Sequence, residues 1–217
     1  GLRSSTSLVD AMNHLDQLHE LCSASGAAAE AVLARDWVVS CVRYLRADPA
    51  SLSDYKLVGR VLELASLIMC GRSLDEDDLH RLRTCVEGLV GLLGGLSDVL
   101  DSLREDDPAI GWLHCDMRLQ TAHSTGATVP DEHRATVQHF REAVLNFIAE
   151  FILCEQRSSP GSPTTASLLV EDTSFLSVVC TQRFPGCGSL AVRVRSAALR
   201  CMPLVLRGAN GCNNESE

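Results

Sequence analysis

The stretch that decides the fold is Asp131–Gln156, DEHRATVQHFREAVLNFIAEFILCEQ. Its apolar residues recur at helical spacing and extend nearly all round the expected helix: Val137, Phe140, Val144, Leu145, Phe147, Ile148, Phe151, Ile152 and Leu153. A helix that is apolar on most sides is buried on most sides. One polar stripe remains, at four-residue spacing and therefore on one face: Gln138, Glu142, Asn146 and Glu150. The sequence predicts a central helix covered by its neighbours, with a thin polar line that reaches water.

The composition favours an all-α fold. The chain has 217 residues, 46% of them hydrophobic but only 4% aromatic. This balance suits helices packed by aliphatic side chains better than a β-sandwich, which requires more aromatic and β-branched alternation. The length allows one large core or a short run of repeats. Because the sequence begins at Gly1, we expect it to be part of a longer chain.

The net charge of −9 argues against direct nucleic-acid binding, because phosphate contacts require a basic face. No membrane segment is predicted either. The longest apolar run, 143–154, is interrupted by Asn146 and Glu150 and is too short to span a bilayer. No secretory signal is recognised at the start of the sequence.

Ten cysteines are scattered along the chain without a CxxC pair, at positions 22, 41, 70, 85, 115, 154, 180, 187, 201 and 212. Most lie in apolar helical stretches, where a thiol behaves as a small hydrophobic group. This usage indicates a reducing compartment and predicts an intracellular protein of the cytoplasm or nucleus.

Outward from the central helix, the apolar spacing predicts further helices that pair along the chain: 5–23 with 27–45, 54–70 with 76–103, 108–122 with 131–156, and 172–184 with 190–206. Residues 1–207 are expected to form one helical domain, followed by a disordered tail at 208–217.

Local signals set the expected helix ends. Gly71 is a natural C-terminal stop, and Ser73–Glu76 has the pattern of a capping box. Gly94-Gly95 is expected to kink or split the helix that follows. The polar stretch 158–167 is expected to be a flexible loop. Its Ser159-Pro160 and Ser162-Pro163 pairs match proline-directed phosphorylation sites, although an ordinary loop explains them as well.

The last predicted helix contains Val194-Arg195-Ser196-Ala197-Ala198-Leu199. This string resembles the Val-Arg-x-x-Ala pattern of the second helix in a HEAT repeat. The resemblance implies that the alanines permit close helix packing and that the arginine ties neighbouring repeats together. With helix pairs beginning roughly fifty residues apart, it predicts a right-handed array of about four antiparallel pairs, an α-solenoid of the HEAT/armadillo type.

No catalytic residue, metal ligand or cofactor site is predicted. His114 and Cys115 are adjacent, so on a helix they point about 100 degrees apart and cannot pair directly. The cysteines at 180, 187, 201 and 212 are too loosely spaced for a typical zinc site. The acidic runs stand at helix starts, where the helix dipole explains them.

On the solenoid analogy, the second helices line a concave face that binds a partner. Five arginines would contribute to it: Arg43, Arg134, Arg141, Arg193 and Arg200. Such a groove would suit an acidic or phosphorylated segment of another protein. Scattered, solvated arginines are the alternative reading.

The sequence therefore predicts a non-enzymatic scaffold that binds another protein, as a repeat segment of a larger intracellular protein or complex. Two alternatives stay open. One is a helical-bundle enzyme or metal-binding domain that uses Cys and His. The other is a self-associating domain, a homo-oligomer with the central helix or its neighbour as the dimer face.

Overall fold

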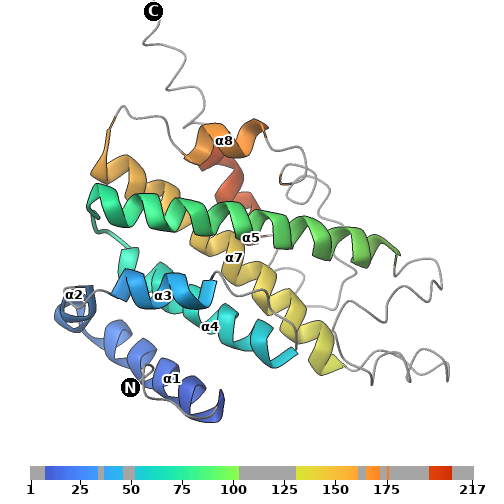
Figure 1. The fold of residues 1–217 in the computed structure, drawn as a ribbon, viewed down its shortest axis with the longest axis horizontal. Coiled ribbons are helices and arrows are strands. Elements are labelled where there is room, and N and C mark those ends of the chain that lie inside the picture. Colours follow the sequence, from blue (N-terminus) through green and yellow to red (C-terminus); the bar gives the residue numbers. More distant parts are fainter. Residues whose placement is uncertain are drawn as a thin grey trace, which may run out of the picture.

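Every secondary-structure element that the structure describes is a helix (Figure 1). This computed structural model describes residues 8–33, 37–45, 52–102, 131–160, 165–171, 175 and 196–206. Its helices are α1 (Leu8–Ala24), α2 (Gly26–Leu33), α3 (Trp37–Leu45), α4 (Leu52–Met69), α5 (Glu76–Ser102), α7 (Asp131–Ser158) and α8 (Thr165–Glu171). Residues 196–206 are helical as well. No strand occurs among the described residues, which confirms the all-α expectation.

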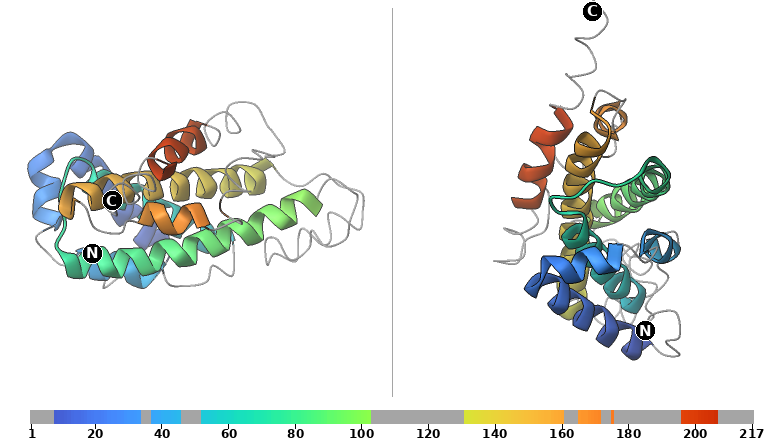
Figure 2. Two further views of the ribbon diagram at one scale, coloured as in Figure 1. Left: turned by 90° about the horizontal axis from the view of Figure 1, so that it is seen from above. Right: turned by 90° about the vertical axis from the view of Figure 1, so that its left-hand side faces the viewer.

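Helix α7 lies at the centre of the molecule, as predicted. Figure 2 shows it between α5 on one side and residues 196–206 on the other. Its aromatic residues Phe140, Phe147 and Phe151 are fully buried. Phe147 and Phe151 stack with ring centroids 6.3 Å apart, and Tyr55 of α4 meets the Phe140 ring edge-on at 5.1 Å. Burial of these rings supplies a large share of the hydrophobic stabilisation.

The helix pairing differs from the expected succession of neighbours along the chain. Helix α4 packs most extensively on α7 and also on α1, whereas α5 packs on α3 and α7. The expected pairing of 54–70 with 76–103 is therefore not the main contact of either helix. The reason is the apolar circumference of α7, which needs cover from several helices at once. Gly59 of α4 faces α7. A Cβ added to Gly59 would lie 3.9 Å from the Phe140 Cα, which is ordinary van der Waals contact.

The helix ends show which local signals the fold uses. Gly71 stops α4 with a φ of 72°, as predicted. The capping box at Ser73 is wrong by two residues, because α5 begins at Glu76 and Asp75 caps it. The Asp75 Oδ1 accepts a hydrogen bond from the Asp78 N–H at 2.8 Å.

Two further helix boundaries differ from the sequence prediction. Helix α5 continues through Gly94-Gly95 without a split. The predicted helix over 27–45, expected to bend near Asp36, corresponds to two described helices, α2, which ends at Leu33, and α3, which begins at Trp37.

Two arginines complete the C-terminal end of α4. Arg72 donates to the Ile68 carbonyl at 2.9 Å and to the Gly26 carbonyl at 3.1 Å. Arg157, at the end of α7, donates to the Met69 carbonyl at 3.2 Å and to the Arg72 carbonyl at 2.9 Å. These guanidinium groups satisfy carbonyls that a helix end leaves without partners, and their positive charge suits the negative end of the dipole.

The expected loop over 158–167 is wrong at both ends. Ser158 belongs to α7, and Thr165 begins α8. The buried Glu155 carboxylate explains the start of α8. It accepts hydrogen bonds from the Thr165 N–H at 2.6 Å and the Thr165 hydroxyl at 3.1 Å, and it forms an ion pair with Arg83 of α5. A side chain from another helix thus caps a segment whose own sequence is typical of a loop.

Several sequence predictions fall outside the described residues. These are the expected helix 108–122, the expected helix 172–184 apart from Phe175, which is helical and buried, and the tail 208–217. Within the described part of the chain, no helix combines the length and the apolar character that crossing a bilayer requires.

Candidate functional site

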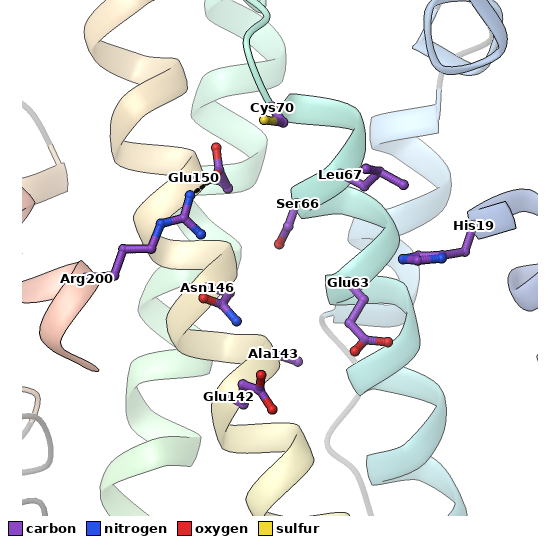
Figure 3. A pocket seen from close by; sticks show the side chains of 10 residues that line it. All are labelled: His19, Glu63, Ser66, Leu67, Cys70, Glu142, Ala143, Asn146, Glu150 and Arg200. Atoms are coloured by element: carbon purple, nitrogen blue, oxygen red, sulfur yellow. Dashed lines mark hydrogen bonds and ion pairs between the residues drawn. The ribbon is translucent and has the colours of Figure 1, made fainter. Parts of the chain in front are cut away.

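The polar stripe on α7 faces a pocket rather than open solvent. Glu142 and Asn146 are half-buried, while Gln138 and Glu150 are buried. The stripe was predicted as a line that reaches water, and this is confirmed for its middle only. Glu142, Asn146 and Glu150 form one wall of a pocket of about 300 Å³ (Figure 3).

The remaining walls come from three other parts of the chain. Helix α4 and the residue that follows it contribute Glu63, Ser66, Leu67 and Cys70. His19 of α1 and Arg200 of residues 196–206 complete the lining, together with Ala143 of α7. Segments almost two hundred residues apart in the sequence therefore meet around one cavity, and Figure 3 shows α4 and α7 facing each other across it.

Arg200 joins residues 196–206 to the wall of the pocket through an ion pair with Glu150 (Figure 3). The Glu150 side chain is only 8% exposed, whereas that of Arg200 is 47% exposed. A carboxylate buried to this degree needs a charged or hydrogen-bonding partner. Arg200 supplies it from the solvent side, so the pair sits at the boundary between the core and the pocket.

Glu63 anchors a second charged network at the pocket. Its carboxylate accepts a hydrogen bond from Arg60 at 2.8 Å and lies 3.4 Å from His139 Nε2. Arg60 also forms an ion pair with Asp16 of α1 at 3.4 Å. Burial by itself raises the pKa of Glu63, but the hydrogen bonds and charges of His139 and Arg60 outweigh burial and lower the pKa to about 2. Glu63 is therefore ionised over the whole physiological range.

The charged lining of the pocket is predominantly acidic. The lining contains three glutamates, Glu63, Glu142 and Glu150, and one arginine, Arg200. Arg200 is paired with Glu150, and Glu63 is paired with Arg60, which lies beside the lining. A cationic group is the ligand chemistry that this balance favours.

Of the five arginines predicted to line one groove, the structure describes the side chains of Arg43, Arg141 and Arg200, and these three lie in different surroundings. Arg43 is exposed on α3, and Arg200 lines the pocket. Arg141 is the clear error, since it is only 1% exposed and is among the largest fully buried side chains. It precedes Glu142 by one residue, which turns it about 100 degrees away from the polar stripe and into the core. The side chain of Arg134 and all of Arg193 lie outside the described residues.

The described cysteines are poor candidates for nucleophiles. Cys22, Cys41, Cys85, Cys154 and Cys201 are buried and unbridged. Burial raises the pKa of Cys41 and of Cys201 to about 12, and it raises those of Cys22 and Cys154 as well. A thiol with a raised pKa contains little of the reactive thiolate. Cys70, which lines the pocket, is the exposed thiol of this part of the chain.

The described residues contain no group of three or more His, Cys, Asp or Glu side chains that is able to hold a metal ion. Of the cysteines weighed for a zinc site, Cys201 is buried, and Cys180, Cys187 and Cys212 lie outside the described residues. His114 and Cys115 lie outside them too.

The sequence prediction identified the α7 wall of the pocket but not the α4 wall. The signal was present, because Glu63, Ser66, Leu67 and Cys70 have the spacing i, i+3, i+4 and i+7 of a single helix face. Only the packing of α4 on α7 makes the two polar faces opposite walls of one cavity.

Comparison with known proteins gives no relative from which a function could be inferred. No family model matches the chain, and no curated protein or solved structure matches it either.

Proposed function

We propose that this chain is a non-enzymatic helical module that binds another protein, and that the pocket between α4 and α7 receives a basic side chain of that partner. The module would be a segment of a larger intracellular protein or complex, in the cytoplasm or nucleus. No cofactor is assigned to it.

One observation carries the proposal. Helix α7 is buried along most of its described length, yet the side of it that bears Glu142, Asn146 and Glu150 opens into a cavity. Four separate parts of the chain bring polar side chains to that cavity. Polar groups on a core helix cost stability unless they have hydrogen-bond or ion-pair partners. Their concentration around one cavity therefore supports a role in recognising a charged ligand.

The charge of the pocket changes the expected chemistry of the partner. An acidic or phosphorylated segment required several arginines on one face, and burial of Arg141 removes one of them from that face. The excess of glutamates over arginine favours a lysine or arginine side chain instead. Binding of an acidic or phosphorylated partner segment, as expected from the sequence, is one of the results that the test below distinguishes.

The proposal also concerns whether the helices form a solenoid of successive pairs or a bundle around α7. Burial of Ala197 and Ala198 agrees with the close packing that the HEAT-like string implies. The extensive packing of α4 on α7, which are not consecutive helices, favours a bundle around α7 over an array of successive pairs.

Self-association through α7 is not part of the proposal, because its apolar residues are buried within the chain. The dimer face that the sequence suggested on this helix stays a prediction, which the mass in solution tests. A face on a neighbouring helix is still open to a measurement of the mass in solution.

The test begins with capture of partners from cell extract on three baits: the wild-type chain, the Glu142→Gln variant and the Glu87→Gln variant. Glu142 lines the pocket, whereas Glu87 is exposed on α5 and is not part of the lining, so the control removes the same charge elsewhere. Overlapping peptides from the captured protein are then titrated against all three chains.

We expect one basic peptide to bind the wild type and the Glu87→Gln variant equally, and Glu142→Gln about tenfold more weakly. The affinity should also fall as the salt concentration rises. Binding that resides in an acidic or phosphorylated peptide, or that falls equally in both variants, would contradict the proposed pocket.

A further inference from the structure

Two consecutive serines join the end of α7 to the start of α5. The Ser158 Oγ accepts a hydrogen bond from the Leu74 N–H at 2.8 Å and donates to the Cys154 carbonyl at 2.9 Å. The Ser159 Oγ donates to the Glu76 carboxylate, Oε2, at 3.0 Å. Glu76 is the first residue of α5. Short polar contacts thus join the two helices at their ends.

Ser159 is also part of a Ser-Pro motif, which its hydrogen bond to Glu76 does not require. It is partly exposed and is followed by the exposed Pro160, so the pair forms an accessible Ser-Pro motif. The second Ser-Pro motif of the chain, Ser162-Pro163, lies outside the described residues.

We propose that Ser159 is a phosphorylation site of a proline-directed protein kinase, and that its phosphate separates the end of α7 from the start of α5. In the reaction the Ser159 Oγ forms a bond to the γ-phosphorus of ATP, and the bond from that phosphorus to ADP breaks. The hydroxyl proton passes to the catalytic base of the kinase.

The consequence follows from the groups around Ser159. Phosphorylation removes the hydroxyl donor that faces Glu76 and substitutes a group that carries close to two negative charges. The start of α5 is already acidic, at Asp75, Glu76, Asp77 and Asp78. These carboxylates occupy the positive end of the α5 dipole, so the phosphate meets repulsion there rather than a vacant anion site.

The nearest arginines do not offset that repulsion without a further loss. Arg157 and Arg72 both donate to carbonyl groups at and just beyond the C-terminal end of α4. If Arg72 turned to the phosphate, the Ile68 carbonyl would lose this donor, and if Arg157 turned, the Arg72 carbonyl would lose it; the Met69 carbonyl keeps the Arg72 N–H. In both cases the junction of α4, α5 and α7 is weakened.

Access of the kinase is coupled to the same junction. The Ser159 N–H donates to the Glu155 carbonyl at 2.9 Å, which extends the last turn of α7. A kinase that binds its substrate in an extended form must open this turn. The kinase therefore phosphorylates the chain while this turn is open. Variants that destabilise the contacts between the end of α7 and the start of α5 should be phosphorylated faster.

The test uses the full chain of 217 residues, a purified proline-directed kinase and ATP, with the modified position mapped by mass spectrometry. The variants are Ser159→Ala, Ser162→Ala as the matched Ser-Pro control, and Glu76→Gln. We expect a phosphate on Ser159 of the wild type and of Ser162→Ala. Phosphorylation should lower the Tm by about 2–4 °C, and by less than half as much in Glu76→Gln.

Three outcomes would overturn the proposal. The first is a phosphate that is absent from Ser159 or found on Ser162 alone. The second is a phosphorylated chain whose Tm is unchanged or higher. The third is an equal fall in Tm in the wild type and in Glu76→Gln, which would show that repulsion by Glu76 is not the cause. None of these outcomes bears on the pocket between α4 and α7.

Discussion

Glu155 is the residue on which most of the long-range polar contacts around α8 depend. It is 1% exposed and serves Arg83 of α5 and Thr165 of α8 at once. A buried carboxylate is stabilising only while its partners are in place, because removal of one side of such a pair leaves the other uncompensated. No feature of the local sequence around Thr165 predicts this role, since the capping group comes from another helix.

We expect Glu155→Ala to lower the free energy of unfolding by about 3 kcal/mol, the low end for a broken buried pair, because Arg83 is partly exposed. Urea denaturation followed by circular dichroism measures the loss. Glu87→Ala, at an exposed position of the same charge, should change stability by less than about 0.5 kcal/mol. Equal effects of the two substitutions would show that the Glu155 contacts contribute nothing beyond the charge.

Glu63 makes stability depend on pH in the acid range. Its pKa falls from an ordinary value of 4.5 to about 2 in the folded chain. A lowered folded-state pKa contributes stability that is present above the unfolded value and is lost as the pH falls from 4.5 towards 2. The contribution above that window is at most about 3 kcal/mol.

The measurement is a series of urea denaturations between pH 5 and pH 3 on the wild type and Glu63→Gln. We expect the variant to lose part of the decline in stability that the wild type shows on acidification. The exposed Glu87→Gln variant should keep the wild-type decline. A Glu63→Gln curve parallel to that of the wild type would show that His139 and Arg60 do not stabilise the ionised carboxylate.

At the scale of the elements, the effect of a glycine depends on its position in the helix. Gly71 adopts a positive φ of 72° that other residues rarely tolerate, whereas Gly88 lies exposed within α5 with open space around its Cα. The two positions therefore predict opposite effects of the same substitution.

Gly71→Ala should destabilise the protein by about 1 kcal/mol, because an L-residue is strained in the left-handed conformation. Gly88→Ala should stabilise it by about 0.5–1 kcal/mol, because alanine reduces the entropy of the unfolded chain and favours the helix. Thermal or urea unfolding of the pair tests both signs together. A stabilising Gly71→Ala would show that the positive φ is not required for the α4 stop.

At the scale of the whole molecule, α7 is the helix on which most of the other described helices pack. It contacts α4, α5 and α8, and Arg200 ties residues 196–206 to it. One buried surface therefore serves most of the described helices, and they are expected to unfold together rather than one by one.

Phe147→Ala tests this connection. The ring is fully buried and stacked on Phe151, so its removal should cost about 3–5 kcal/mol. Leu168→Ala, at an exposed apolar position of α8, should cost less than about 0.5 kcal/mol. A single unfolding transition in far-UV circular dichroism, shifted as a whole, is expected. Separate transitions would indicate that the helices around α7 are independent units.

Composition and periodicity were sufficient to predict the all-α class, the position and burial of α7, and the polar stripe that becomes one wall of the pocket. The local sequence was sufficient to predict the stop at Gly71. Each of these depends on periodicity or on the conformation of one residue, and both are encoded within a few turns of helix. The apolar circumference of α7 was sufficient to predict that other helices would cover it.

Local patterns did not predict which helices cover α7, where α8 begins or what charge the pocket carries. Helix α4 is the main partner of α7 although the two helices are far apart in the sequence, and α8 begins where the distant Glu155 meets Thr165. Arg141 was misplaced because one residue of helix rotation separates the core from the polar stripe. These outcomes depend on contacts between residues far apart in the chain, and the local pattern contains no information on which distant group will arrive.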